Sequence, residues 1–199
     1  MSNIFIDSMK KRRSIYHLGS TLPVSKDEVN QTIKDALMYA PSAFNSQSAR
    51  AIILYGNESK KVWDIIAKTL KSLVPEDQFS ETEKKINSFA SGAGTVLIFE
   101  DMSVIRGLQE MMPTYADNFT LWSHHGTGIS QYAVWTALAN IGVGASLQHY
   151  GNLIEDEVKK TWNLSKDWSL IAQMPFGSIE TPAGEKEFIP IENRVSIYN

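Results

Sequence analysis

The chain has 199 residues, of which 43% are hydrophobic and 21% charged, and its net charge is −3. That length fits a single domain, residues 1–199, with a core of ordinary size, and the acidic balance excludes a general attraction for nucleic acid or an anionic membrane. The sequence contains no cysteine, which excludes thiol catalysis, disulfides and cysteine-ligated clusters, so any redox chemistry must come from a bound cofactor.

No segment approaches the roughly 18 consecutive apolar residues that a membrane-spanning helix needs. The N-terminal stretch, MSNIFIDSMKKRRS, lacks the long apolar core of a signal peptide. We therefore expect a cytoplasmic protein with neither a membrane nor a nucleic acid as its partner.

The first predicted helix, residues 3–13, ends in four cations, Lys10 to Arg13. Such a run usually lies on a solvated face or complements the C-terminus of a helix. The alternative is a phosphate clamp, because Arg12 and Arg13 carry forked donors and Ser14 carries a hydroxyl. The residues alone leave both interpretations open.

A second helix is predicted from Ser25, where Ser25 and Glu28 have the spacing of a capping box. Apolar residues recur at four-residue spacing along one face of this helix and form its buried stripe. They are Val29, Ile33, Leu37 and Ala40. Pro41 lacks a backbone N–H and should stop the helix.

The loop 41–49 is a polar turn between that helix and a short apolar strand, residues 51–55. Binding groups often lie in such loops. Asn45 and Gln47 carry carboxamides, which donate and accept hydrogen bonds at once and suit the edge of a flat heterocycle. An equally good interpretation is a turn whose side chains bond to its own backbone.

The middle of the chain predicts an amphipathic helix over 58–73 and another that begins with a capping box at Ser80 and Glu83. The apolar run 95–100 is typical of a strand covered on both faces. Residues 102–112 are weakly helical. The aromatic-rich segment 113–125 is expected to be a loop that either packs over the core or forms part of a pocket lip. The adjacent pair His124 and His125 has no third ligand at a suitable spacing, so we predict no metal site.

Residues 126–141 form the most apolar helix candidate, with almost no charge on any side. A helix that is apolar all round is buried in a core or against a partner chain. After it we expect an edge strand or extended loop at 145–150, a helix at 153–162 and a buried strand at 169–174. The tail 181–199 is poor in apolar residues and predicts an extended arm over another surface.

Three separated pieces together resemble the FMN-dependent nitroreductase superfamily, and the resemblance covers nearly the whole chain. They are Arg12-Arg13-Ser14, the loop motif P-S-x-x-N-S-Q from Pro41 to Gln47, and Arg194. The segments YADNF (115–119) and SLQHY (146–150) are similar to one branch of the superfamily. That branch holds small bacterial and yeast proteins related to the fatty-acid-repression and copper-induced nitroreductases.

The resemblance implies an α+β fold with a central, mostly antiparallel sheet flanked by helices. It also implies a homodimer with FMN at the subunit interface, in which helix 126–141 is the central dimer helix and the tail crosses the partner. NADH or NADPH would reduce FMN at N5, and a nitroaromatic, quinone or similar flat acceptor would take the hydride in a ping-pong cycle without a catalytic side chain. The implied cofactor-binding residues are Arg12, Arg13, Ser14, Tyr16, Ser42, Asn45, Ser46, Gln47, Leu147, Gln148, His149 and Arg194.

Two positions depart from the superfamily pattern. Tyr16 stands where an Arg or Lys usually faces the N1–O2 edge of the flavin, and Ser48 replaces a proline. Arg13 and Arg50 are the candidates to replace the missing cation. The loss also motivates an alternative function, an FMN- or ligand-binding regulatory protein with little turnover.

Overall fold

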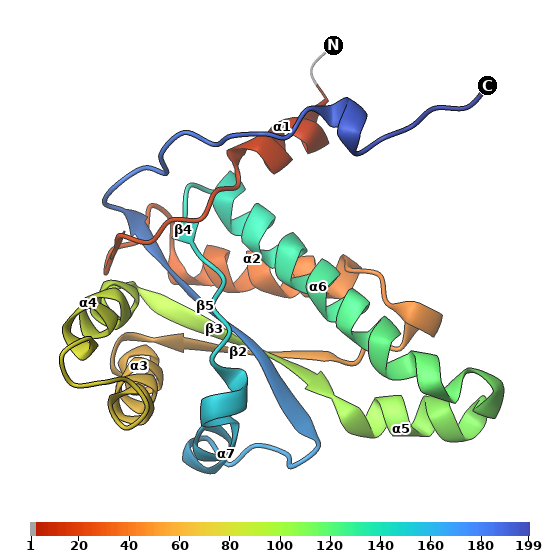
Figure 1. Cartoon of the computed structure of the whole chain (residues 1–199), viewed down its shortest axis with the longest axis horizontal. Helices are drawn as coiled ribbons and strands as arrows, with labels where there is room; N and C mark the ends of the chain where they lie inside the picture. The colour runs from red at the N-terminus through yellow and green to blue at the C-terminus, as the bar shows by residue number, and fades with distance from the viewer. Residues whose placement is uncertain (1–2) are drawn as a thin grey trace.

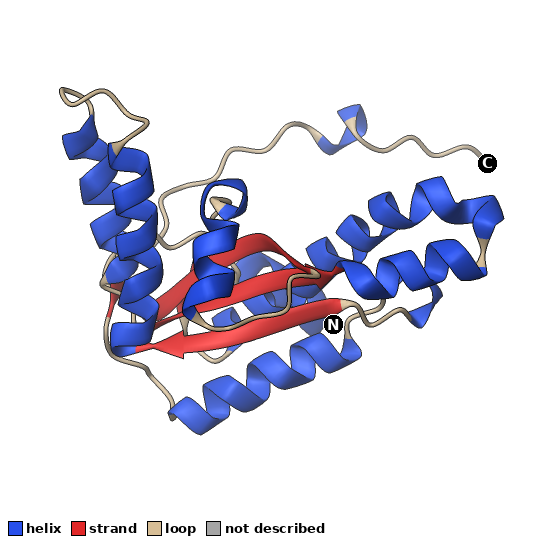
Figure 2. Cartoon of the chain, turned by 90° about the horizontal axis from the view of Figure 1, so that it is seen from below, coloured by secondary structure: helices blue, strands red, loops and turns tan. Residues whose placement is uncertain are grey.

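The computed structural model of the protein describes residues 3–199, and a central sheet lies between two layers of helices (Figures 1 and 2). The helices are α1 (Ile4–Lys11), α2 (Lys26–Tyr39), α3 (Gly56–Lys71), α4 (Phe79–Ala90), α5 (Met102–Met111), α6 (Ala116–Asn140) and α7 (Gly151–Thr161). The strands are β1 (Leu18–Gly19), β2 (Ala49–Tyr55), β3 (Gly94–Asp101), β4 (Gly144–Ala145) and β5 (Trp168–Ile179). Three 3-10 turns complete the fold, η1 (Ala43–Asn45), η2 (Pro113–Tyr115) and η3 (Ile191–Asn193).

The strands follow the spatial order β1-β5-β3-β2, and β4 also pairs with β5. Each of these strand pairs is antiparallel. The predicted α+β fold, with an antiparallel sheet flanked by helices, is therefore confirmed.

Strand β3 lies at the centre of the sheet and is buried along its whole length. Because side chains alternate across a strand, Val96 and Ile98 face one helical layer while Leu97 and Phe99 face the other. All four are fully buried, which confirms the prediction of a strand covered on both faces.

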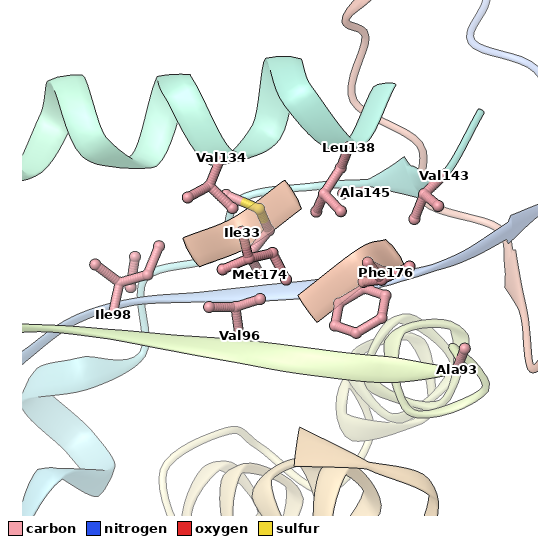
Figure 3. Close-up of a cluster of buried hydrophobic side chains, with 12 residues drawn as sticks. Ile33, Ala93, Val96, Ile98, Val134, Leu138, Val143, Ala145, Met174 and Phe176 are labelled. Carbon is pink, nitrogen blue, oxygen red and sulfur yellow. The ribbon is translucent and has the colours of Figure 1, made fainter. Parts of the chain in front are cut away.

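Two hydrophobic cores lie on opposite faces of the sheet. On one face α2 and α6 contribute Ile33, Val134 and Leu138, which pack on Val96 and Met174 (Figure 3). On the other face α3, α4 and α7 build a core rich in large side chains. It includes Val62, Trp63, Ile66, Ile86, Phe89, Ile154 and Val158.

The two predicted helix caps differ in outcome. Ser25 is the N-cap of α2, and its Oγ accepts a hydrogen bond from the Glu28 N–H at 3.1 Å. The predicted cap at Ser80 is wrong, because α4 already begins at Phe79 and Ser80 lies inside its first turn. The preceding residue, Gln78, has near-helical backbone angles (φ −105°, ψ −11°), whereas a side-chain cap needs an extended residue at that position.

Helix α6 is longer than predicted, and the expectation of a loop over 113–125 is wrong. After the short turn η2, the chain is continuously helical from Ala116 to Asn140. Tyr115, Phe119 and Trp122 have the i, i+4, i+7 spacing of one helical face. The helix is also not buried all round within one chain, because Ile129 remains 44% exposed.

Strand β5 continues through Pro175 to Ile179 instead of ending at Met174. The Pro175 carbonyl accepts a hydrogen bond from the Ser146 N–H at 3.3 Å, just beyond β4. In an antiparallel strand the N–H and C=O of a residue point the same way, so Pro175 cannot donate to Ser146 in return. Two residues further on, Gln148 and Gln173 still exchange both of their backbone hydrogen bonds. The proline therefore removes one hydrogen bond from this side of β5 without ending the strand.

Beyond β5 the chain continues as an extended arm, residues 180–199, which leaves the sheet and contains only the short turn η3 (Figures 1 and 2). Residues 184–199 are all exposed. The prediction of an extended tail is thus confirmed, while its position over another surface remains a prediction. Within residues 3–199, no helix has the length and apolarity required to cross a lipid bilayer.

Candidate functional site

The two arginines of the predicted clamp follow α1 and are held by different contacts. Arg12 is the C-cap residue of α1, and its guanidinium lies 4.2 Å from the centroid of the Trp135 ring on α6. Its Nε atom is buried and has no hydrogen-bond partner in the described part of the chain. Arg13 reaches the arm, where its Nη2 donates to the Gly184 carbonyl at 2.6 Å. The ring contact orients Arg12 and leaves one of its donors unpaired.

The clamp lies beside the segment 147–149, which is predicted to run past the bound flavin. Ser14 forms a parallel β-bridge with Ala145, and the Ile15 N–H donates to the Ala145 carbonyl at 2.9 Å. Further along, the buried residue Gln148 donates its backbone N–H to Gln173 at 2.8 Å. Two pieces more than 130 residues apart in sequence are therefore neighbours in the fold.

The other two residues of that segment differ from Gln148 in burial. Leu147 is partly buried and packs on the core between the sheet and α2 and α6. His149 is exposed. The Gln148 side chain turns inward, where its Nε2 donates to Ser146 Oγ at 3.1 Å. Binding of a flavin by these three residues remains a prediction.

A cavity of about 470 Å³ lies between the clamp and the base of the arm. Arg12, Arg13, Ser14 and Tyr16 line it together with residues 181–186. Its volume is in the range of small-molecule pockets, and its two guanidinium groups suit an anion such as a phosphate. Tyr16 is 51% exposed and brings no charge to the cavity.

The loop 42–48 contains the most unusual backbone of the molecule. Phe44, Asn45 and Gln47 have φ angles of 53°, 52° and 47°, and among residues 3–199 only one further non-glycine residue, Asn163, has a positive φ. A non-glycine residue in this region costs about 1–3 kcal/mol and persists only where its surroundings hold it. Such residues gather at binding sites.

Serine side chains and backbone groups satisfy much of the loop internally. Ser42 Oγ accepts from the Gln47 N–H at 3.0 Å, and the Ser42 carbonyl accepts from the Asn45 N–H at 3.0 Å. Ser46 Oγ lies 3.2 Å from Ser48 Oγ. The interpretation as a self-bonded turn is therefore confirmed for the serines. Asn45 and Gln47 stay exposed, and their contact with a ligand remains a prediction.

The loop and the clamp contact α6 at different places. The loop meets α6 at Gly126, where a Cβ atom would be in ordinary van der Waals contact with Ser42 Cβ at 3.4 Å. Arg12 meets the same helix at Trp135, nine residues later. At 1.5 Å per residue the two contacts are roughly 14 Å apart along the helix. Within one chain, the loop and the clamp are therefore two separate groups of residues that contact α6 at different places.

Arg50 follows the loop and is already paired. Its Nη2 lies 3.0 Å from Asp101 Oδ2, and its Nη1 donates to the Gln47 carbonyl at 2.7 Å. Burial would raise the pKa of the Asp101 carboxyl, but hydrogen bonds from Ser103 and the charge of Arg50 outweigh it and hold that pKa below its ordinary value. Asp101 is therefore ionised at neutral pH and neutralises Arg50.

Arg194 is not brought to the clamp within the described chain. It is the C-cap residue of η3 on the exposed arm. Its predicted contact with the cofactor phosphate remains a prediction that requires the arm to meet another surface. No group of three or more His, Asp or Glu residues within 3–199 is arranged to hold a metal ion.

Sequence reasoning noted the aromatic side chains of 113–125 but not that three of them gather around Phe44 beside the loop 42–48. The Phe44 ring lies 6.0 Å from Trp122 in a stacked arrangement, 5.4 Å from Phe119 and 6.3 Å from Tyr115. The helical spacing of Tyr115, Phe119 and Trp122 was the available signal. Phe44 itself is 55% exposed, so a flat apolar surface accompanies the exposed carboxamides of the loop.

Comparison with known proteins places this geometry in a family. The family profile described as Nitroreductase family matches residues 9–178. Nitroreductase FRM2 of Saccharomyces cerevisiae is 32% identical over 198 residues, which cover 98% of this chain and 97% of that protein.

Solved structures agree with that match. Nitroreductase CinD from Lactococcus lactis, in complex with nicotinic acid, is 45% identical with a TM-score of 0.92 and covers 98% of this chain and 100% of its own. Other structures of CinD contain 4-nitrophenol and chloramphenicol. A protein of Exiguobacterium sibiricum in complex with FMN shares the fold, at 16% identity and a TM-score of 0.73 over 100% of this chain and 99% of that one. The chain therefore belongs to the nitroreductase family of oxidoreductases.

Proposed function

We propose that the protein is an FMN-dependent oxidoreductase that uses NADH or NADPH to reduce nitroaromatics, quinones or similar flat acceptors. The observation that carries this proposal is the cavity at the clamp, which Arg12, Arg13 and Ser14 line together. Its support from relatives is that CinD binds 4-nitrophenol and that the Exiguobacterium protein binds FMN. The cytoplasm, where both nicotinamide nucleotides are used, is the proposed location.

The residues at the clamp fit the phosphate of FMN. The Arg12 Nε atom is a buried donor without a partner, and an unpaired buried donor costs about 1–3 kcal/mol. A phosphate oxygen would satisfy it. Arg13 and the Ser14 hydroxyl line the same cavity and would supply further donors to the anion.

Other residues of the chain would bind and orient the ring system. The exposed carboxamides of Asn45 and Gln47 match the alternating donors and acceptors on the pyrimidine edge of a flavin. The rings of Phe44 and Trp122 offer a surface on which a flat acceptor stacks. When bound, FMN would supply the redox chemistry of hydride transfer between a nicotinamide nucleotide and the acceptor.

The proposed active unit is a homodimer with FMN at the subunit interface. Within one chain the loop and the clamp are roughly 14 Å apart on α6, and Arg194 lies on the exposed arm, outside the residues that line the clamp cavity. A cavity of about 610 Å³ runs between α1, α2 and α6, where the buried hydroxyls of Tyr132 and Thr136 have no hydrogen-bond partner among residues 3–199. A second copy on this face would cover α6 and bring the separated parts together.

Anaerobic titration of the purified protein tests the proposal. We expect a yellow protein with one FMN per subunit, whose flavin absorbance bleaches on addition of NADH or NADPH and returns when a nitroaromatic is added. A colourless protein that fails to bind added FMN would refute the proposal. The nucleotide that bleaches the flavin at lower concentration identifies the preferred donor.

A second candidate function is an FMN-binding regulator with little turnover. The observation in its favour is that Tyr16 brings no charge to the clamp cavity, while Arg50 is neutralised by Asp101. Stabilising negative charge on a reduced ring is an electrostatic task that needs a cation or backbone N–H groups. Tight FMN binding without bleaching by either nucleotide would favour this candidate, and rapid bleaching would exclude it.

A further inference from the structure

We propose that Arg50 and Asp101 are positioning residues that hold the loop 42–48 in the shape that contacts FMN, and that they thereby set the affinity for the cofactor. The inference rests on the proposed function, because it takes the loop to be part of the FMN site. In this role Arg50 does not replace the cation that the superfamily usually has at position 16. It holds the backbone of the loop instead.

The Arg50 guanidinium uses both of its terminal nitrogens. Nη1 donates to the Gln47 carbonyl at 2.7 Å and to the Ala49 carbonyl at 3.1 Å, while Nη2 donates to Asp101 Oδ2 at 3.0 Å. A planar fork can serve the loop and a carboxylate at the same time, which a lysine ammonium cannot do with the same geometry. Arg50 therefore links the last residues of the loop to the end of β3.

Asp101 is itself firmly held. Its Oδ1 accepts from the Ser103 N–H at 3.1 Å and from the Ser103 hydroxyl at 2.6 Å, which makes it the N-cap residue of α5. Its own N–H donates to the Ser48 carbonyl at 3.0 Å. With only 8% of its surface exposed, Asp101 is a fixed anchor on the rigid sheet, and it contacts the loop both directly and through Arg50.

The loop needs such an anchor because its backbone is strained. The left-handed residues Phe44, Asn45 and Gln47 lie within four positions, and each costs free energy that the surroundings must offset. The bonds to Ser42 and between Ser46 and Ser48 are internal to the loop. Arg50 and Asp101 instead tie Gln47 and Ser48 to the sheet, so they decide whether Gln47 keeps its conformation when FMN is absent.

Arg50→Gln in the full chain is the main test. A loop that must be ordered during binding weakens affinity, and loss of charge-assisted bonds of this kind corresponds to about a ten- to hundredfold rise in the FMN dissociation constant. FMN release on dilution of the loaded protein, followed by flavin fluorescence, measures this change. Arg50→Lys should recover little of the lost affinity, because its compact ammonium replaces only part of the fork.

Hydrogen exchange provides a readout that does not depend on enzymatic turnover. The amides of Gln47 and Asp101 are protected by bonds to Ser42 Oγ and to the Ser48 carbonyl. In Arg50→Gln we expect both amides to exchange faster in the full chain, and added FMN to restore part of their protection. The amides of the α3, α4 and α7 core should exchange as in the wild type.

Two control variants separate positioning from general stability. Arg106→Gln removes the ion pair with Asp167 near the same end of the sheet but outside the loop, and it should leave FMN affinity unchanged. Ile66→Val removes one methyl group from the opposite core and destabilises the chain without touching the loop. It should lower the thermal midpoint while the FMN dissociation constant stays at the wild-type value.

The outcomes distinguish this inference from the proposed function. If the wild type binds FMN and Arg50→Gln binds it equally well, the positioning role is wrong and the proposed function stands. If affinity falls in Ile66→Val as much as in Arg50→Gln, the effect is one of stability alone and the inference is again wrong. If the wild type binds no FMN, it is the proposed function that fails.

Discussion

The two faces of the central sheet are built from different kinds of residues. On the face covered by α3, α4 and α7, the large rings of Trp63, Phe89 and Phe99 are less than 2% exposed. Two of the polar side chains among them are matched, since Trp63 Nε1 donates to Thr95 Oγ1 at 2.9 Å and that hydroxyl lies 2.7 Å from Ser59 Oγ. Among residues 3–199, one buried polar atom on this face has no partner, Gln173 Nε2 on β5.

The face covered by α2 and α6 is not complete by itself. Five buried polar atoms in residues 3–199 have no hydrogen-bond partner, and four of them belong to α6 or to a residue in contact with it. These are Arg12 Nε, Glu100 Oε1, Tyr132 Oη and Thr136 Oγ1. Because native interiors rarely leave such atoms unpaired, this face is where we place the ligand and the second copy of the chain. We propose that the face covered by α2 and α6 carries the function, while the opposite face mainly supports the fold.

The largest effect is expected from Trp63→Ala on the face covered by α3, α4 and α7. Removing a fully buried aromatic side chain leaves a cavity and should lower the free energy of unfolding by about 3–5 kcal/mol. Urea denaturation measures the loss. Below the unfolding transition the FMN dissociation constant should not change. A loss of FMN affinity in parallel with the loss of stability would show that the two faces do not act independently.

The next effect is expected from Ile129→Glu on the open side of α6. Ile129 lines the cavity between α1, α2 and α6 and is 44% exposed in the single chain. An uncompensated charge in a closed interface costs several kcal/mol, so the dimer dissociation constant should rise about a hundredfold or more, as measured by analytical ultracentrifugation.

A control for this variant lies on the opposite side of the sheet. Leu73 follows the end of α3 and is 60% exposed, so Leu73→Glu should leave the dimer intact. A monomeric wild type, or a dimer that tolerates Ile129→Glu, would show that α6 is not the contact between subunits.

A smaller effect is expected from Arg13→Ala at the clamp. Loss of a charge-assisted bond to phosphate is worth about 1.5–3 kcal/mol, so the FMN dissociation constant should rise by roughly one to two decades while stability changes little. Lys10→Ala is the matched control, because Lys10 belongs to the same basic run but pairs with Asp7 in solvent. Unchanged flavin retention in Arg13→Ala would show that the clamp is assigned wrongly.

The smallest effect concerns acid stability and Glu155 of α7. Burial would raise the pKa of the Glu155 carboxyl, but bonds from Lys159 and from the Leu170 N–H outweigh it and lower that pKa below its ordinary value. A lowered pKa in the folded state contributes stability above the unfolded pKa, and that contribution is lost as pH falls through the folded pKa.

Glu155→Gln should therefore be less stable than the wild type at pH 7, by about 1 kcal/mol or less because the group is partly solvated. The two proteins should converge in stability below about pH 4. Urea denaturation at a series of pH values measures this, and FMN affinity at pH 7 should stay unchanged. A difference in stability that persists at pH 3 would contradict the assignment.

Local patterns predicted much of the fold, because they depend on neighbours in sequence. The stripe of Val29 and Ile33 identified α2, and Ser25 identified its start. The run 95–100 identified a strand buried on both faces. The error at Pro175 arose because a proline does not end a strand whose neighbours hold it on both sides of the proline, and here those neighbours are Ser146 and Gln148.

The sequence by itself therefore predicted most of the elements and the family, and it proposed the residues of the clamp and the loop, since periodicity and short motifs are properties of adjacent residues. Only the tertiary structure decided that α6 runs unbroken past Gly126, where Ser42 of the loop contacts the helix. Only the tertiary structure showed that Arg50 pairs with Asp101, 51 residues away. Arg50 is therefore a link between the loop and β3, and its charge is already neutralised. Contacts of this kind join residues that are distant in the chain, and their partners become known only when the sheet and helices have brought them together.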